Sequence, residues 1–255
     1  MLLSLSVALM DSLTIAAASG LKSRMESLDL LANNLANSAT AGYKRDQEFY
    51  GVFSSADADS GGDGPTATMP TIQRQWTDFS AGEIQTTGNP LDVAISGNGF
   101  FAVDGPNGPL YTRNGSLQVL PSGDLAAAGG LPLRSASGGG IHVSAGKPIE
   151  ISPDGTVRQQ GQTLGQLAVV NFKSTDSLTK AKSACFQNND TKNPPFTATN
   201  VEVQQGKLEG SNVPVAEAAM RLVGVMRQFE MLQKAVGVSS DMDTKTIQEV
   251  ARVGS

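Results

Sequence analysis

Few residues in this sequence occur in a pattern that could do chemistry. The run Gly97-x-Gly99-x-x-Ala102 matches the glycine fingerprint of a dinucleotide-binding turn, and it follows a strand-like stretch. A working fingerprint needs a helix whose N-terminus holds the pyrophosphate, whereas residues 100–106 are typical of a strand and a turn. We therefore interpret these glycines as a turn between two strands.

Candidate nucleophiles and metal ligands are equally sparse. The chain has one cysteine, Cys185, and one histidine, His142, so it offers no cluster of ligands for zinc. We expect Cys185 to be a buried small hydrophobic residue and His142 to lie on the surface or in a strand. The acidic pairs Asp57/Asp59 and Asp241/Asp243 lack the further ligands that a cation site requires. We predict no catalytic residue, no metal and no cofactor.

The composition of the chain limits the kinds of molecule it could bind. The 255 residues carry a net charge of -5 without a block of Lys or Arg that could neutralise successive phosphates, which argues against nucleic acid. The 28 glycines favour short strands and many turns. The apolar start lacks a basic region and is interrupted by Asp11, so we interpret residues 1–9 as an extension rather than a secretory signal.

Two stretches have the apolar spacing of amphipathic helices. Residues 11–37 contain no proline, and residues 214–250 form a similar pattern at the other end of the chain. Successive apolar positions are three or four apart in both, at Leu21, Met25, Leu28, Ala32 and Leu35, and at Ala219, Leu222, Met226, Phe229, Leu232 and Val236. Each stripe could pack inside its own chain or against neighbouring chains; their place at the extreme ends favours neighbouring chains.

The interior predicts strands. Short runs that favour strands, separated by glycine-containing turns, occur at residues 91–95, 100–103, 110–113, 149–152, 156–158 and 167–172. Residues 54–70 are rich in Ser, Gly, Asp and Pro, so we predict a loop or linker there.

Together these patterns predict an α+β fold class. The N- and C-terminal α-helices would form a coiled-coil-like helical domain, into which a mainly antiparallel β sandwich or barrel is inserted. The expected ranges are 1–9 for the extension, 10–46 for the first helix, 47–87 for an extended linker, 88–205 for the β-rich domain and 206–255 for the second helix.

Three ordered segments have the character of signatures. Residues 31–45 are LANNLANSATAGYKR; residues 88–103 are GNPLDVAISGNGFFAV, followed by YTRNGS at 111–116; residues 205–213 are QGKLEGSNV, followed by RQFE at 227–230. In these segments the chain resembles the bacterial flagellar axial family, the rod and hook proteins of the basal body. Its modest length, the short strand at 167–172 and the sequence RQFE make it most similar to the proximal rod protein of that family.

The resemblance implies a structural subunit, not an enzyme. Such a subunit is exported by the flagellar type III apparatus without a cleaved signal peptide. It polymerises through its terminal helices into the hollow helical rod that crosses the periplasm and transmits torque. The implied partners are copies of itself, other rod proteins and the export apparatus, with no nucleic acid and no small-molecule substrate.

Other functions stay open at this point. The chain could be a distal rod or hook-type subunit of the same family. A secreted β-rich adhesin is an alternative from another class, but it would need exposed aromatic residues, and Trp76 is the only tryptophan. A cell-wall hydrolase would need a pair of carboxylates, and no pair stands out.

The expected subunit interface combines residues from both ends of the chain: Leu28, Leu31, Asn33, Asn34, Leu35, Asn37, Leu208, Ser211, Asn212, Met226, Arg227, Phe229 and Glu230.

We predict that Leu35→Asp abolishes incorporation into rods and leaves the β-rich domain folded, because a carboxylate in the apolar stripe opposes burial between subunits. Motility of cells carrying only this variant is the measurement. Normal motility would count against the interface.

Overall fold

The computed structural model describes residues 2–54 and 68–253, which form two compact units. Unit 1 comprises residues up to 35, residues 46–76 and residues from 215 onward. Unit 2 comprises residues 36–45 and 77–214. Each unit therefore combines segments that are far apart in the sequence.

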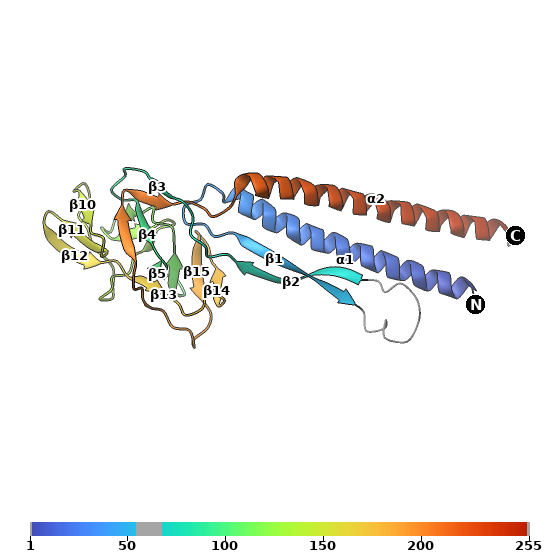
Figure 1. The fold of residues 1–255 in the computed structure, drawn as a ribbon, viewed down its shortest axis with the longest axis horizontal. Coiled ribbons are helices and arrows are strands. Elements are labelled where there is room, and N and C mark those ends of the chain that lie inside the picture. Colours follow the sequence, from blue (N-terminus) through green and yellow to red (C-terminus); the bar gives the residue numbers. More distant parts are fainter. Residues whose placement is uncertain (1, 55–67, 254–255) are drawn as a thin grey trace. The chain divides into compact units, whose positions relative to one another are not determined.

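Unit 1 contains the two helices and a two-stranded sheet. The helices are α1 (Leu2–Ala36) and α2 (Val215–Val253), and the strands are β1 (Asp46–Ser54) and β2 (Thr68–Thr77) (Figure 1). The buried carboxylate of Glu48 on β1 ties the three parts together, since it accepts a hydrogen bond from Ser27 Oγ of α1 at 2.6 Å and lies 3.6 Å from Arg221 of α2. Most of the predicted linker 54–70 lies outside the described residues.

The buried face of α1 differs from the predicted apolar stripe. From residue 18 to residue 36, its buried positions are Gly20, Ser23, Ser27, Leu31 and Asn34, whereas Met25 of the predicted stripe is 53% exposed. Small residues let neighbouring backbones approach closely, and Leu232 of α2 packs beside Gly20. The sequence pattern found the helix but not the side that packs.

The buried side of α2 agrees better with its predicted apolar stripe than the buried side of α1 does. Ala218 and Val225 are buried. The predicted positions Leu222, Phe229, Leu232 and Val236 are half-buried on the same side. Met226, which was predicted to share that stripe, is 46% exposed.

Unit 2 is built from strands. Their bounds are β3 (Ile84–Thr86), β4 (Val93–Ser96), β5 (Phe100–Gly105), β6 (Gly108–Thr112), β7 (Gln118–Val119), β8 (Leu125–Ala127), β9 (Leu131–Pro132), β10 (Ile149–Ile151), β11 (Thr156–Gln159), β12 (Gln162–Gln166), β13 (Val169–Asn171), β14 (Leu178–Lys180), β15 (Cys185–Asn188), β16 (Phe196–Thr197), β17 (Glu202–Gln205) and β18 (Lys207–Glu209).

These strands form five sheets. The largest has the order β14-β15-β6-β5-β13-β16, and the others are β10-β11-β12, β7-β8-β9, β17-β4 and β18-β3. The pairs within these sheets are antiparallel. Alternation along β5 gives the largest sheet two buried faces, because Phe101 and Val103 join the main aliphatic core while Phe100 and Ala102 join an aromatic cluster.

The predicted fold class is wrong. Among the described residues no coiled-coil-like helical domain is evident: between residues 18 and 36 the buried face of α1 lacks a continuous apolar seam, and β1 shares that face with α2. The β region is antiparallel and extensive, but its strands divide among one six-stranded sheet and four smaller ones instead of two facing sheets. In the described part of the chain, neither helix has an apolar stretch that could cross a membrane.

Candidate functional site: a buried charged cluster and an exposed helix face

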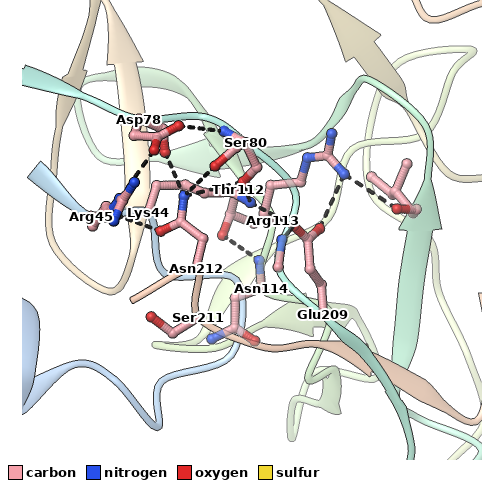
Figure 2. A network of polar contacts seen from close by, with 12 residues as sticks. Lys44, Arg45, Asp78, Ser80, Thr112, Arg113, Asn114, Glu209, Ser211 and Asn212 are labelled. Carbon is pink, nitrogen blue, oxygen red and sulfur yellow. Dashed lines mark hydrogen bonds and ion pairs between the residues drawn. The ribbon is translucent and has the colours of Figure 1, made fainter. Parts of the chain in front are cut away.

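Three charged side chains meet inside unit 2. The Glu209 carboxylate lies between Lys44, whose Nζ donates to Oε1 at 2.5 Å, and Arg113, whose guanidinium donates to Oε2 at 3.1 Å (Figure 2). Glu209 and Lys44 are each 1% exposed and Arg113 is 4% exposed. We call Lys44, Arg113 and Glu209 the charged cluster.

Backbone groups complete most of its hydrogen bonding. Gly82 N–H donates to Glu209 Oε1 at 2.9 Å, and Lys44 Nζ also donates to the Ser80 carbonyl at 2.7 Å. The Arg113 guanidinium donates to the carbonyls of Ile95 and Gly97 at 3.2 and 2.7 Å. Every charge in the cluster therefore has a partner, as a charge removed from water requires.

Burial and ion pairing have opposite effects on the pKa values of the two cations. Burial lowers the pKa of Lys44 and of Arg113, because it disfavours their charged forms, and Glu209 opposes this by attraction and by its hydrogen bonds. The single carboxylate thus holds two positive charges in the interior of unit 2.

Asn212 links backbone segments beside the charged cluster through hydrogen bonds. Its amide oxygen accepts from Arg45 N–H at 2.7 Å, and its amide nitrogen donates to the Asp78 carbonyl at 2.8 Å (Figure 2). The Arg45 side chain in turn donates to the Asp78 carboxylate at 3.1 Å. One asparagine thereby joins the chain that follows α1, the chain after β2 and the chain that precedes α2.

Gly42 explains why the first of these segments can come so close. It has a φ of 67°, and a Cβ there would overlap the backbone of Arg113 and Asn114. Its N–H donates to the Glu209 carbonyl at 2.7 Å. The segments 31–45, 111–116 and 205–213 that stand out in the sequence therefore meet at one place.

This arrangement supports structure rather than catalysis. Both oxygens of its buried carboxylate already accept hydrogen bonds from the protein, so it is poorly placed to act as a base on a substrate. Among the described residues no group of three or more His, Cys, Asp or Glu side chains could hold a metal ion. Cys185 is buried on β15, as predicted, and His142 is exposed beside Asp124 at 3.4 Å. Asp57 and Asp59 lie outside the described residues.

A second feature lies on α2. Met220 is 71% exposed, Met231 and Met242 are each 62% exposed, and Val238 is 59% exposed. At about 100° per residue these four positions fall within a narrow sector, roughly opposite the side that carries Ala218 and Val225. We call Met220, Met231, Val238 and Met242 the outer stripe of α2.

The exposed side of α1 has a complementary character. It carries Met25 and Ala32 together with the carboxylates Glu26 and Asp29, all exposed. Lys22 lies 4.0 Å from Glu26 on that side. The exposed cations beside the outer stripe of α2 include Arg227 and Lys234.

The predicted interface residues differ in their exposure to solvent. Leu31 and Asn34 are buried, Leu28, Leu35, Asn37, Leu208, Ser211, Asn212 and Phe229 are half-buried, and Asn33, Met226, Arg227 and Glu230 are exposed. Asn34 exchanges two hydrogen bonds with the backbone of Asp46, and Ser211 Oγ accepts from Val213 N–H. Asn34, Ser211 and Asn212 thus have contacts within their own chain, and the interface as a whole stays a prediction.

The charged cluster was missed from the sequence. Lys44, Arg113 and Glu209 are up to 165 residues apart, and no periodicity links them. The available signal was that each lies in one of the three signature segments.

Replacing Glu209 should destabilise unit 2 strongly. Glu209→Gln leaves two buried cations without a counter-charge, so we expect the free energy of unfolding to fall by about 3–5 kcal/mol. Urea denaturation followed by circular dichroism measures this. Glu202→Gln, at an exposed position of β17, is the control, and an equal loss in both variants would contradict the role of the cluster.

Asp78 should make stability depend on acidity. Although burial raises the pKa of this carboxyl, hydrogen bonds from Ser80 and Arg45 outweigh it and lower the pKa below 3.8. Because the folded pKa is depressed, the stabilisation is present above pH 3.8 and is lost as pH falls through the lower folded value. Denaturation from about pH 6 to about pH 2 should show a smaller acid-induced loss in Asp78→Asn than in wild type. Asp176→Asn, at an exposed site, should follow wild type; parallel curves for Asp78→Asn and wild type would contradict this prediction.

Comparison with known proteins places these features in a family. Residues 94–159 match the flagellar hook protein FlgE/F/G D1 domain, and residues 204–249 match the flagellar basal body rod FlgEFG protein C-terminal region. Arg113 lies within the first match, and Glu209, Asn212 and the whole outer stripe lie within the second.

Similar proteins extend the match along most of the chain. The chain is 30% identical over 225 residues to the flagellar basal-body rod protein FlgF of Mesorhizobium japonicum, covering 86% of this chain and 91% of that protein. It is 32% identical over 228 residues to FlgF of Escherichia coli K12, covering 82% and 86%. It is 30% identical over 256 residues to the rod protein FlgG of Buchnera aphidicola subsp. Acyrthosiphon pisum, covering 90% and 96%. This chain belongs to the flagellar basal-body rod protein family.

Proposed function

We propose that this chain is a structural subunit of the flagellar rod that polymerises through the exposed sides of its two terminal helices. The observation that carries the proposal is the outer stripe of α2, an apolar surface opposite the side that packs within unit 1. Water-exposed apolar side chains aligned along a helix are typical of a surface that another protein covers. In a rod protein, that other protein is a neighbouring subunit.

The partner surface we propose is α1 of a second copy. Its exposed side offers Met25 and Ala32 for apolar contact and Asp29 for charge, whereas Arg227 and Lys234 flank the outer stripe. Opposite charges at the rim of an apolar contact fix its register more than they add affinity. Because the donor and acceptor surfaces differ, each copy can bind one neighbour with α2 and another with α1, which is how a heterologous contact grows into a helical polymer.

Location and further partners follow from this role. Membership of the family places the chain in the flagellar basal body with other rod components. We extend this to a position in the periplasmic part of the rod, to export without a cleaved signal peptide and to contact with the export apparatus, all of which a rod subunit needs. We also keep the proximal end of the rod as the proposed position.

A charge-exchange experiment tests the contact. Asp29→Arg and Arg227→Asp should each lower the amount of chain in isolated basal bodies roughly tenfold, because a pair worth about 0.2–1 kcal/mol becomes repulsive in every subunit contact. The double variant restores opposite charges, so it should recover incorporation. Quantitative mass spectrometry of basal bodies from cells with the variant as their only copy gives the readout.

Arg158→Asp is the matched control. It makes the same change at an exposed position of β11 in unit 2 and should incorporate like wild type. Failure of the double variant to exceed either single variant would reject the pairing of Asp29 with Arg227. Absence of the wild-type chain from basal bodies would reject the rod function itself.

A further inference from the structure

Among the side chains that the structure describes, the most exposed methionines lie on α2. The only cysteine, Cys185, is 1% exposed, and burial raises the pKa of its thiol, so little reactive thiolate forms. By contrast, Met220 is 71% exposed and Met231 is 62% exposed, both on the outer stripe of α2. An oxidant in solution therefore meets these thioethers before it meets the thiol.

The placement of the two methionines makes their oxidation consequential. They are eleven residues apart, about three helical turns, and hence lie along the same line of the helix. A thioether is apolar and adapts its shape to a partner, whereas a sulfoxide is polar and needs a hydrogen-bond donor. Two sulfoxides in one contact would place unpaired polar oxygens where a neighbour presents apolar side chains.

We propose that Met220 and Met231 are oxidation sites through which peroxide-class oxidants control subunit assembly. This inference rests on the proposed function, because it assumes that the outer stripe is covered in the polymer. In the oxidation, the thioether sulfur forms a bond to one peroxide oxygen, the O–O bond breaks, and the other oxygen leaves as water. Sulfur is oxidised by two electrons and peroxide is reduced by two.

The modification is reversible and specific to the unassembled state. A methionine sulfoxide reductase removes the oxygen as water, while two thiols of the reductant become a disulfide. Once a neighbour covers the outer stripe, the sulfurs are shielded from solvent. Peroxide therefore stops the addition of new subunits and leaves assembled ones intact.

Two pairs of variants separate oxidation from packing. Met220→Leu with Met231→Leu keeps apolar side chains of similar size but cannot be oxidised. Met220→Gln with Met231→Gln places a polar oxygen near that of a sulfoxide and keeps a good helix former. In cells that carry each as the only copy, we expect the Leu pair to incorporate into basal bodies like wild type and the Gln pair to drop at least roughly tenfold. Equal incorporation of the two pairs would overturn the inference while leaving the rod function in place.

Peroxide footprinting supplies the second readout. Purified wild-type chain and isolated basal bodies are exposed to the same hydrogen peroxide series, and sulfoxide at each methionine is measured by peptide mass spectrometry. We expect Met220 and Met231 to oxidise several times faster in the purified chain than in basal bodies. Equal rates in the two samples would overturn the inference, since the outer stripe would then be uncovered in the polymer. If basal bodies lack this chain altogether, the proposed function fails as well. The measurement of wild-type chain in basal bodies, described for the charge-exchange experiment, separates that outcome from failure of the oxidation proposal alone.

Discussion

The burial of one carboxylate organises unit 2. Glu209 is nearly inaccessible to water, and a carboxylate in that position is tolerated only when cations and N–H groups surround it. Lys44, Arg113 and the N–H of Gly82 meet that requirement, and they come from three separate regions of the sequence. To bury Glu209 is therefore to bring those regions together. Hydrophobic packing alone is less selective, because it accepts many arrangements of similar volume.

In unit 1, each helix has two roles. One side packs within its own chain, and the other side is exposed and available to a neighbouring subunit. Helix α2 separates the two tasks by side: Ala218 and Val225 are buried, whereas Met220 and Met231 face solvent. In helix α1 the two roles fall to different residue types, since the buried positions from residue 18 onward are largely small or polar and Met25 is exposed. The apolar side chains that one chain leaves uncovered are those that a neighbouring copy can cover.

Local patterns in the sequence predict local structure here, and they miss what depends on distant contacts. The helix at residues 11–37, the second helix near 214–250 and the strand at 100–103 were predicted, because each depends on spacing within a short window. The packed side of α1 was not, because Gly20, Ser23 and Ser27 pack by being small and carry no hydrophobic signal. The charged cluster was not either, since spacing says nothing about which distant charges will pair. The outer stripe of α2 was not predicted, because the apolar positions on the opposite side of the helix already explained the helical spacing.

The distance along the chain between Lys44 and Glu209 has a consequence for the order of events during synthesis. The two residues are 165 positions apart, so their ion pair has a very high contact order. A ribosome releases the N-terminal part first, and Lys44 must wait for most of the chain before its counter-charge emerges. Until then, local hairpins such as β5-β6 can form, whereas closure of unit 2 cannot. A nascent or truncated chain that ends before Glu209 cannot form this ion pair, so we expect unit 2 to stay accessible to chaperones and proteases until Glu209 has emerged.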